Sequence, residues 1–215
     1  EIMIDYSLGV CVIGDKSVGK SSFVWRLDKD EFRKTMATIG VDFVSKICTV
    51  IRKNSLYNFR WLIWDTAGQE RFRSIVKSYF RNGTVFILFY DITNRTSFGN
   101  LKYWIEQVYS LSENPLIYLV GSKYDLNDKR MIQYKDALDF SKKHKCKYYE
   151  ISSKNNIGID EIIRIINNDI LDIILDKTIT NEEKGIMNIK SYVNNVSFGL
   201  NIDEGNYVKK CCSIS

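Results

Sequence analysis

Residues 14–21 form a glycine-containing motif that constrains the fold more than any other feature. The segment Gly-Asp-Lys-Ser-Val-Gly-Lys-Ser separates a short apolar run, Leu8–Ile13, from a stretch with helical spacing, Lys20–Leu27. In a strand–loop–helix unit of this kind, main-chain N–H groups and the positive end of the helix dipole point to one position. The sequence therefore predicts an α/β fold in which this loop binds an anion. Its form, G-x-x-x-x-G-K-[ST], indicates a polyphosphate.

Further apolar runs alternate with helix-like stretches along the rest of the chain. Strands are predicted at Phe43–Ile51, Phe59–Trp64, Val85–Tyr90, Ile117–Gly121 and Tyr148–Ile151, and helices at Phe72–Phe80, Ser97–Leu111, Gln133–Lys143 and Asp160–Leu175. The run Val85–Phe89 is continuously apolar, as expected for a sheet covered on both faces. The polar stretch Arg52–Asn58 predicts a hairpin and hence one antiparallel edge strand. The expected fold is a doubly wound, six-stranded, mostly parallel sheet.

The composition limits the class of protein. A chain of 215 residues with 45% hydrophobic and 27% charged residues predicts a single globular domain, which we place at residues 1–175. From Asp176 onward the pattern dissolves and five Lys balance five acidic residues, so residues 176–215 are expected to be a flexible tail. The net charge of +5 without a dense basic run disfavours nucleic-acid binding. No apolar run reaches the ~18 residues that span a bilayer, and scattered cysteines predict a reduced cytosolic protein.

The phosphate loop suggests specific chemical roles. Lys20 would reach the β- and γ-phosphates, and the Ser21 hydroxyl would ligate Mg²⁺. The residues expected to surround the phosphates are Gly14, Asp15, Lys16, Ser17, Val18, Gly19, Lys20, Ser21 and Ser22. The motif alone leaves open an ATPase, a nucleotide kinase and a GTPase.

The segment Asp65-Thr66-Ala67-Gly68-Gln69-Glu70 follows directly after an apolar strand. A carboxylate at this strand end, Asp65, is placed to hold Mg²⁺ through water. Gly68 can present its N–H to a γ-phosphate, and Gln69 can orient a water molecule for in-line attack. These residues predict hydrolysis of a nucleoside triphosphate.

Two later segments follow the last two strands and predict which base is bound. Lys123 and Asp125 come after Ile117–Gly121, and Ser152-Ser153-Lys154 comes after Tyr148–Ile151. The Asp125 carboxylate can accept both the N1–H and the 2-amino group of guanine, a donor pair that adenine lacks. The sequence therefore predicts GTP rather than ATP, with residues 152–154 closing over the base.

In this order and spacing, the motifs resemble those of the small Ras-like GTPases, over roughly Leu8 to Leu175. Within that family the chain is most similar to the Rab proteins. The segments that carry this resemblance are Ile39–Phe43, Arg71–Ile75, Tyr79–Gly83 and Phe89–Thr93.

The resemblance implies further site residues. Thr38 would bind Mg²⁺ and sense the γ-phosphate, and Phe32 would pack on the guanine edge. Phe43, Trp64 and Tyr79 match an aromatic triad that effectors contact, with plain core packing as the alternative. Cys211 and Cys212 resemble a doubly prenylated terminus, the alternatives being palmitoylation or a fortuitous pair.

Two positions depart from the family pattern. Lys16 stands where Gly or Ser is usual, and its side chain could obstruct an activating protein, stabilise transition-state charge or point into solvent. Ser122 stands where the guanine motif has Asn, and its shorter hydroxyl is expected to be unable to brace the base site and the phosphate loop. Guanine specificity should persist while affinity falls by about 1–2 kcal/mol.

The resemblance implies a monomeric GTP/GDP switch that recruits effectors in vesicular membrane traffic. Its partners would be an exchange factor, a GTPase-activating protein, a prenylation escort, an extraction factor and effectors. It would act on the cytoplasmic face of endomembranes, with a cytosolic pool. The competing interpretation is a GTP-bound adaptor with negligible turnover, supported by Lys16 and Ser122, and a nucleotide kinase is a more distant one.

Overall fold

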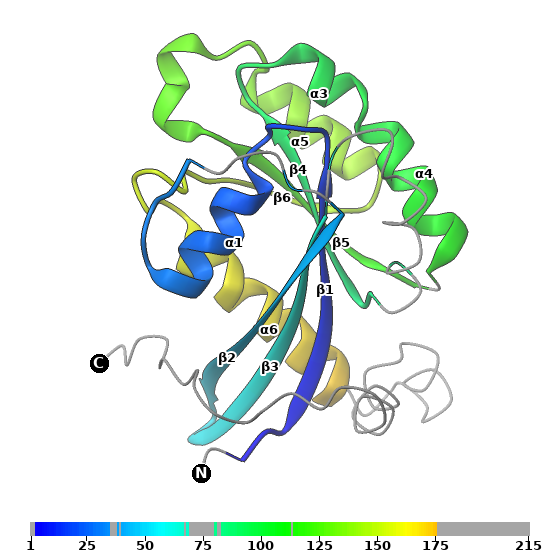
Figure 1. The fold of residues 1–215 in the computed structure, drawn as a ribbon. Helices are drawn as coiled ribbons and strands as arrows, with labels where there is room; N and C mark the ends of the chain where they lie inside the picture. The colour runs from blue at the N-terminus through cyan, green and yellow to red at the C-terminus, as the bar shows by residue number, and fades with distance from the viewer. Residues whose placement is uncertain are drawn as a thin grey trace.

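A six-stranded sheet in the order β2-β3-β1-β4-β5-β6 organises the protein (Figure 1). The computed structural model describes residues 3–34, 38, 40–66, 68, 80, 83–112 and 114–175. The elements are β1 Tyr6–Gly14, α1 Lys20–Lys29, β2 Val41–Arg52, β3 Ser55–Thr66, β4 Val85–Asp91, α3 Arg95–Gly99, α4 Leu101–Leu111, β5 Leu116–Ser122, the 3₁₀ helix η2 Tyr124–Lys129, α5 Tyr134–Lys143, β6 Lys147–Glu150 and α6 Ile159–Leu175.

The pairing confirms the predicted topology. β1 pairs in parallel with β3 and β4, β4 with β5, and β5 with β6, whereas β2 runs antiparallel to β3 at one edge. Val12 of β1 lies opposite Asp65 of β3, and Gly14 lies opposite Phe89 of β4. The carboxyl ends of the central strands therefore meet at one edge, where a doubly wound sheet binds its ligand.

Both faces of the sheet are buried along the central strands β1 and β4. Along β1, Leu8, Val10 and Val12 pack into a core shared with α1 and α6. The alternating residues Cys11 and Ile13 pack into a second core shared with α4 and α5. This period of two with no polar face explains why the strands are continuously apolar.

The hairpin between β2 and β3 is tighter than the sequence suggested. Its strands run unbroken from Val41 to Arg52 and from Ser55 to Thr66, so the polar stretch expected to form the connection is largely strand. Only Lys53 and Asn54 turn the chain, with φ of 49° and 62°. Two successive residues with positive φ form the turn that matches strand twist, and Asn tolerates this conformation.

The single helix expected over Ser97–Leu111 is two helices, α3 and α4, which meet at Asn100. Gly99 weakens helix propensity at the break, and the Asn100 N–H bonds the carbonyl oxygens of Thr96 and Phe98. α3 begins early because the side chain of Asn94 accepts the N–H groups of Thr96 and Ser97. The sequence did not predict η2.

Several predictions fall on residues outside the described ranges. These are the helix Phe72–Phe80 apart from Phe80, and the tail 176–215. α6 is described from Ile159 to Leu175, and the predicted domain boundary at residue 175 stays a prediction. In the part of the chain that the structure describes, no helix combines the length and apolarity needed to cross a membrane.

Candidate functional site

The loop between β1 and α1 has a backbone shape that depends on its glycines. Gly14 has φ of 134°, and a Cβ there would lie 2.3 Å from the carbonyl oxygen of Phe89 in the neighbouring strand. Gly19 precedes α1 with φ of 96°. Both conformations are open to glycine and strained for other residues. The loop thus turns from the sheet into the first turn of α1.

The Lys20 side chain is buried inside this loop. Its ammonium group donates to the carbonyl oxygens of Gly14, at 2.9 Å, and Asp15, at 2.6 Å. Burial lowers the pKa of Lys20 to about 8, although the carboxylates of Asp65 and Asp15 act in the opposite direction. A buried ammonium that bonds main-chain carbonyl groups of the loop can redirect its hydrogen bonds to an anion that enters the loop.

Three oxygen-bearing side chains converge beside Lys20. The hydroxyl groups of Ser21 and Thr38 lie 2.7 Å apart, although 17 positions separate them in the chain. Asp65 is buried, and its Oδ1 has no hydrogen-bond partner among the described residues. Burial raises the pKa of Asp65 to about 6, against the effects of the Ser21 hydroxyl and Lys20. Hydroxyl and carboxylate oxygens are ligands that Mg²⁺ prefers, and the orphaned oxygen is a place for a cation or its water. The residues present therefore fit a magnesium ion.

Gly68 lies directly against the phosphate loop. A Cβ on Gly68 would come 2.3 Å from the carbonyl carbon of Asp15 and 2.4 Å from the amide nitrogen of Lys16. Only a residue without a side chain can approach so closely. The structure thus brings Gly68 to the phosphate loop, and its contact with a γ-phosphate stays a prediction. Gln69 lies outside the described residues.

The Asp15 side chain points away from the interior of the loop. Its Oδ2 accepts from Asn100 Nδ2 at 2.6 Å, and its Oδ1 accepts from Trp104 Nε1 at 2.9 Å. Asn100 and Trp104 are four residues apart at the start of α4 and so share a face of it. Any contact of Asp15 with phosphate is therefore left to its main chain. Sequence reasoning missed both partners, because nothing local links residue 15 to residue 100.

Ser122 contacts the phosphate loop, which corrects the expectation that its hydroxyl is too short to do so. Its Oγ lies 2.6 Å from the carbonyl oxygen of Val18 and 2.9 Å from that of Tyr90. The hydroxyl has one hydrogen and serves one carbonyl at a time, whereas an amide would offer two donors and an acceptor. Ser122 thus provides part of the bracing that an Asn would provide.

The segment after β5 is held to its surroundings at several points. Ser152 Oγ donates to Asp125 Oδ1 at 2.6 Å, which joins the two predicted base-binding segments. Lys123 adopts a left-handed conformation with φ of 63°, and its ammonium bonds Asp91 Oδ2 at 2.6 Å. Sequence reasoning gave Asp91 no role of its own, although this residue ends an apolar strand much as Asp65 does.

Arg26 of α1 joins the residues predicted to close over the base to the helix that follows the phosphate loop. Its Nε and Nη2 donate to the carbonyl oxygens of Ser153, at 3.0 Å, and Lys154, at 3.3 Å. No local feature of the sequence distinguishes Arg26 from other surface arginines. The phosphate and base segments are therefore connected through α1 as well as through Ser122.

The remaining predicted residues lie around this centre. Lys16, Ser17 and Phe32 are exposed, and Ser22 donates its hydroxyl to the Arg33 carbonyl at 3.1 Å. Phe43 is 40% exposed and pairs across the hairpin with Trp64, their rings 6.3 Å apart.

Trp64, in contrast, is largely buried in the second core rather than exposed as an effector-facing residue should be. Of the described aromatic pair, Phe43 alone offers substantial surface. Tyr79, Cys211 and Cys212 lie outside the described residues.

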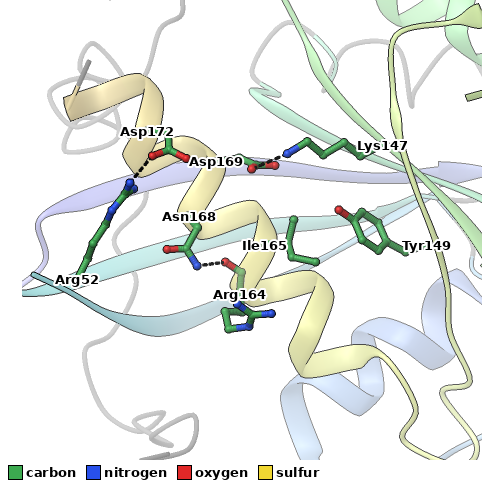
Figure 2. A pocket seen from close by; sticks show the side chains of 8 residues that line it. All are labelled: Arg52, Lys147, Tyr149, Arg164, Ile165, Asn168, Asp169 and Asp172. Carbon is green, nitrogen blue, oxygen red and sulfur yellow. Dashed lines mark hydrogen bonds and ion pairs between the residues drawn. The ribbon is translucent and has the colours of Figure 1, made fainter. Parts of the chain in front are cut away.

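A separate hollow lies at the opposite end of the sheet, between the hairpin, β6 and the last turns of α6 (Figure 2). It is bordered by two ion pairs, Arg52–Asp172 at 2.5 Å and Lys147–Asp169 at 2.6 Å. Lys147 begins β6, at the amino ends of the parallel strands. This hollow is therefore distinct from the convergence of residues at the carboxyl ends.

Comparison with known proteins identifies the family. The model of the Ras family matches residues 9–172. The chain is 41% identical over 157 residues to the human Ras-related protein Rab-22A, covering 72% of this chain and 79% of that protein. It is 41% identical over 165 residues to the rat Ras-related protein Rab-31, covering 76% of this chain and 83% of that protein. It is 37% identical over 160 residues to the Arabidopsis thaliana Ras-related protein RABC1, covering 73% of this chain and 74% of that protein. The chain therefore belongs to the Ras family, within which it is a Rab-like small GTPase.

Proposed function

We propose that the chain is a switch that alternates between GDP- and GTP-bound states, with the nucleotide phosphates on the loop 14–21 and guanine beside Asp125. The observation that carries this proposal is the convergence of a buried ammonium, two hydroxyl groups and an orphaned carboxylate oxygen at the end of β1. Burying such charged and polar groups inside a protein costs free energy unless a partner satisfies them. A magnesium–triphosphate would satisfy all of them.

Each group has a part in binding. Lys20 would turn its ammonium from the carbonyl oxygens of the loop toward the phosphate oxygens, and the anion would favour its charged form. Ser21, Thr38 and Asp65 would hold Mg²⁺, whose charge offsets that of the phosphate oxygens. Gly68 would offer its N–H to the γ-phosphate, and Gln69 would orient the attacking water.

The switch would depend on Thr38 and Gly68. Both lie against the phosphate loop, Thr38 through Ser21 and Gly68 through Asp15 and Lys16. A γ-phosphate would add a partner that both segments share, and its loss would release them. The exposed Phe43 lies on the same hairpin as Asp65, so effectors reading that surface would sense the nucleotide state.

The competing function is an adaptor that holds GTP with negligible turnover. Lys16 favours it, since this exposed cation adjoins Gly68 and could hinder a group supplied by an activating protein. Single-turnover hydrolysis of GTP with magnesium separates the two. A switch releases phosphate, and faster when an activating protein is added. An adaptor retains GTP under both conditions.

Membrane attachment would come from prenylation of Cys211 and Cys212. Two lipid chains give durable binding where one is marginal, and the balanced charge of the tail leaves anchoring to them. The chain would then work with an exchange factor, an activating protein, a prenylation escort, an extraction factor and effectors on endomembranes. Imaging the tagged protein with both cysteines changed to serine tests this. Loss of membrane signal is expected, and unchanged membrane signal would refute it.

A further inference from the structure

A chain of buried and part-buried hydrogen bonds runs across three strands beside the predicted base-binding segments. The hydroxyl groups of Tyr90 and Tyr148 lie 2.7 Å apart, and the Tyr148 hydroxyl donates to Glu150. Arg130 completes the chain with two bonds of 2.7 Å, one from each terminal nitrogen to each oxygen of Glu150. Because a hydroxyl has one hydrogen, Tyr90 must donate to Tyr148. Each link therefore has one direction.

The residues around this series of hydrogen bonds pack closely against it. A Cβ on Gly121, in the strand between the two tyrosines, would lie 2.9 Å from the Tyr90 hydroxyl and 3.0 Å from that of Tyr148. Burial raises the pKa of both tyrosines, so both hydroxyls remain protonated donors. A largely buried network in which every member is bonded favours one geometry.

The network ends on the segment that carries Asp125. Arg130 directly follows η2, and its Nε donates to the Asn127 side chain at 2.8 Å. Its other two nitrogens hold Glu150 of β6. At the opposite end of η2, the Tyr124 N–H bonds the Ile151 carbonyl at 3.0 Å, and Ser152 bonds Asp125 at 2.6 Å. Both ends of η2 are thus tied to three consecutive residues, 150–152.

We propose that Tyr90, Tyr148, Glu150 and Arg130 form a positioning network that fixes the Asp125 carboxylate for guanine, and so determines base selectivity. The proposal rests on the proposed function, in which Asp125 accepts two hydrogen bonds from the base. Two simultaneous bonds require a fixed orientation, whereas one bond tolerates rotation. A loosened η2 should therefore lose the second bond first.

The test compares Tyr148→Phe with a matched control, Tyr118→Phe. Tyr118 is also a buried strand tyrosine whose hydroxyl donates to a carboxylate, Asp169 Oδ2 at 2.8 Å. Asp169 borders the hollow at the far end of the sheet (Figure 2). Both variants lose one hydroxyl-to-carboxylate bond, so both should lower the unfolding temperature. Only Tyr148→Phe removes a link to η2.

The readout is the ratio of affinities for GDP and IDP, since IDP lacks the 2-amino group. Tyr148→Phe should lower this ratio about fivefold, the effect of about one hydrogen bond, and Tyr118→Phe should leave it unchanged. An unchanged ratio in Tyr148→Phe, or an equal fall in Tyr118→Phe, would overturn the proposal. If Tyr148→Phe does not fold, Arg130→Lys supplies the same readout, since one ammonium cannot replace the paired bonds. A wild-type protein without preference for guanine over adenine nucleotides would instead refute the proposed function.

Discussion

The side-chain hydroxyl of Ser122 lies 2.6 Å from the carbonyl oxygen of Val18, so the end of β5 is joined directly to the phosphate loop. The same hydroxyl lies 2.9 Å from the Tyr90 carbonyl. One side chain thus contacts the loop between β1 and α1 and the strand β4. The segments proposed to bind the base and the phosphates are therefore in direct contact at this point.

Ser122→Ala should weaken GDP binding about fivefold, or ~1 kcal/mol, because the loop loses this brace. The matched control is Ser141→Ala, which removes an equally buried hydroxyl that donates to the Leu138 carbonyl at 2.8 Å in α5. Titration with fluorescent GDP measures both. The control should lose stability and keep its affinity for GDP.

Ser122→Asn provides the converse variant. An amide offers two donors and an acceptor, so GDP binding should tighten by about 1–2 kcal/mol. A bracing role of Ser122 is refuted if the affinity for GDP does not rise in Ser122→Asn and does not fall in Ser122→Ala.

Asp65 should make the stability of the nucleotide-free protein depend on pH. Its pKa is raised from 3.8 to about 6, so between these values the folded state binds more protons than the unfolded state. The free energy of unfolding should therefore increase as pH falls from 6 toward 4, by at most about 3 kcal/mol. Above pH 6 the Asp65 carboxyl group is ionised in both the folded and the unfolded protein. The free energy of unfolding is then reduced by the full cost of burying this charge.

Asp65→Asn isolates this contribution, because the other carboxyl groups are unchanged. Urea unfolding of nucleotide-free protein at several pH values should show a wild-type gain on acidification that the variant lacks. If the free energies of unfolding of the two proteins change in parallel with pH, Asp65 is not the source of the pH dependence.

How far the sequence predicts the structure differs between elements. The continuous apolar run in β4 predicted a sheet covered on both faces, and the motif at residues 14–21 predicted the loop, because both depend on local patterns. The contacts of Asp15 with Asn100 and Trp104, and of Arg26 with residues 153–154, join positions far apart in the chain. They depend on how helices pack on the sheet, which a single sequence does not encode locally.

Other differences have signals that were present but weak. Asn94 caps α3 through two N–H groups, and an Asn followed by a helical stretch is a known start signal. The pair Lys53–Asn54 is short enough for a two-residue hairpin turn, which extends both strands into the polar stretch. Side-chain length alone does not determine the contact of Ser122, because the close approach of β5 to the loop brings its hydroxyl to the Val18 carbonyl.

Trp104→Phe should speed GDP release about fivefold, because Asp15 loses one of two donors that hold the phosphate loop. The control is Trp61→Phe, which removes the indole bond of 2.7 Å to Asn167 on the other face of the sheet. Stopped-flow displacement of fluorescent GDP compares them. Equal acceleration in both variants would mean that the effect is general destabilisation.

Lys16→Gly should raise hydrolysis stimulated by an activating protein about tenfold, as expected when a steric cost of ~1.4 kcal/mol is removed. Hydrolysis without the activating protein serves as the internal control. A slower variant in the unstimulated reaction would instead show that the ammonium stabilises the transition state.

The most direct test of the account is competition between nucleotides for the purified protein in magnesium. Fluorescent GDP should be displaced by GDP and GTP and remain bound in equal concentrations of ADP and ATP, because the Asp125 carboxylate is proposed to pair with the two donors of guanine. Equal displacement by adenine nucleotides would contradict the central claim.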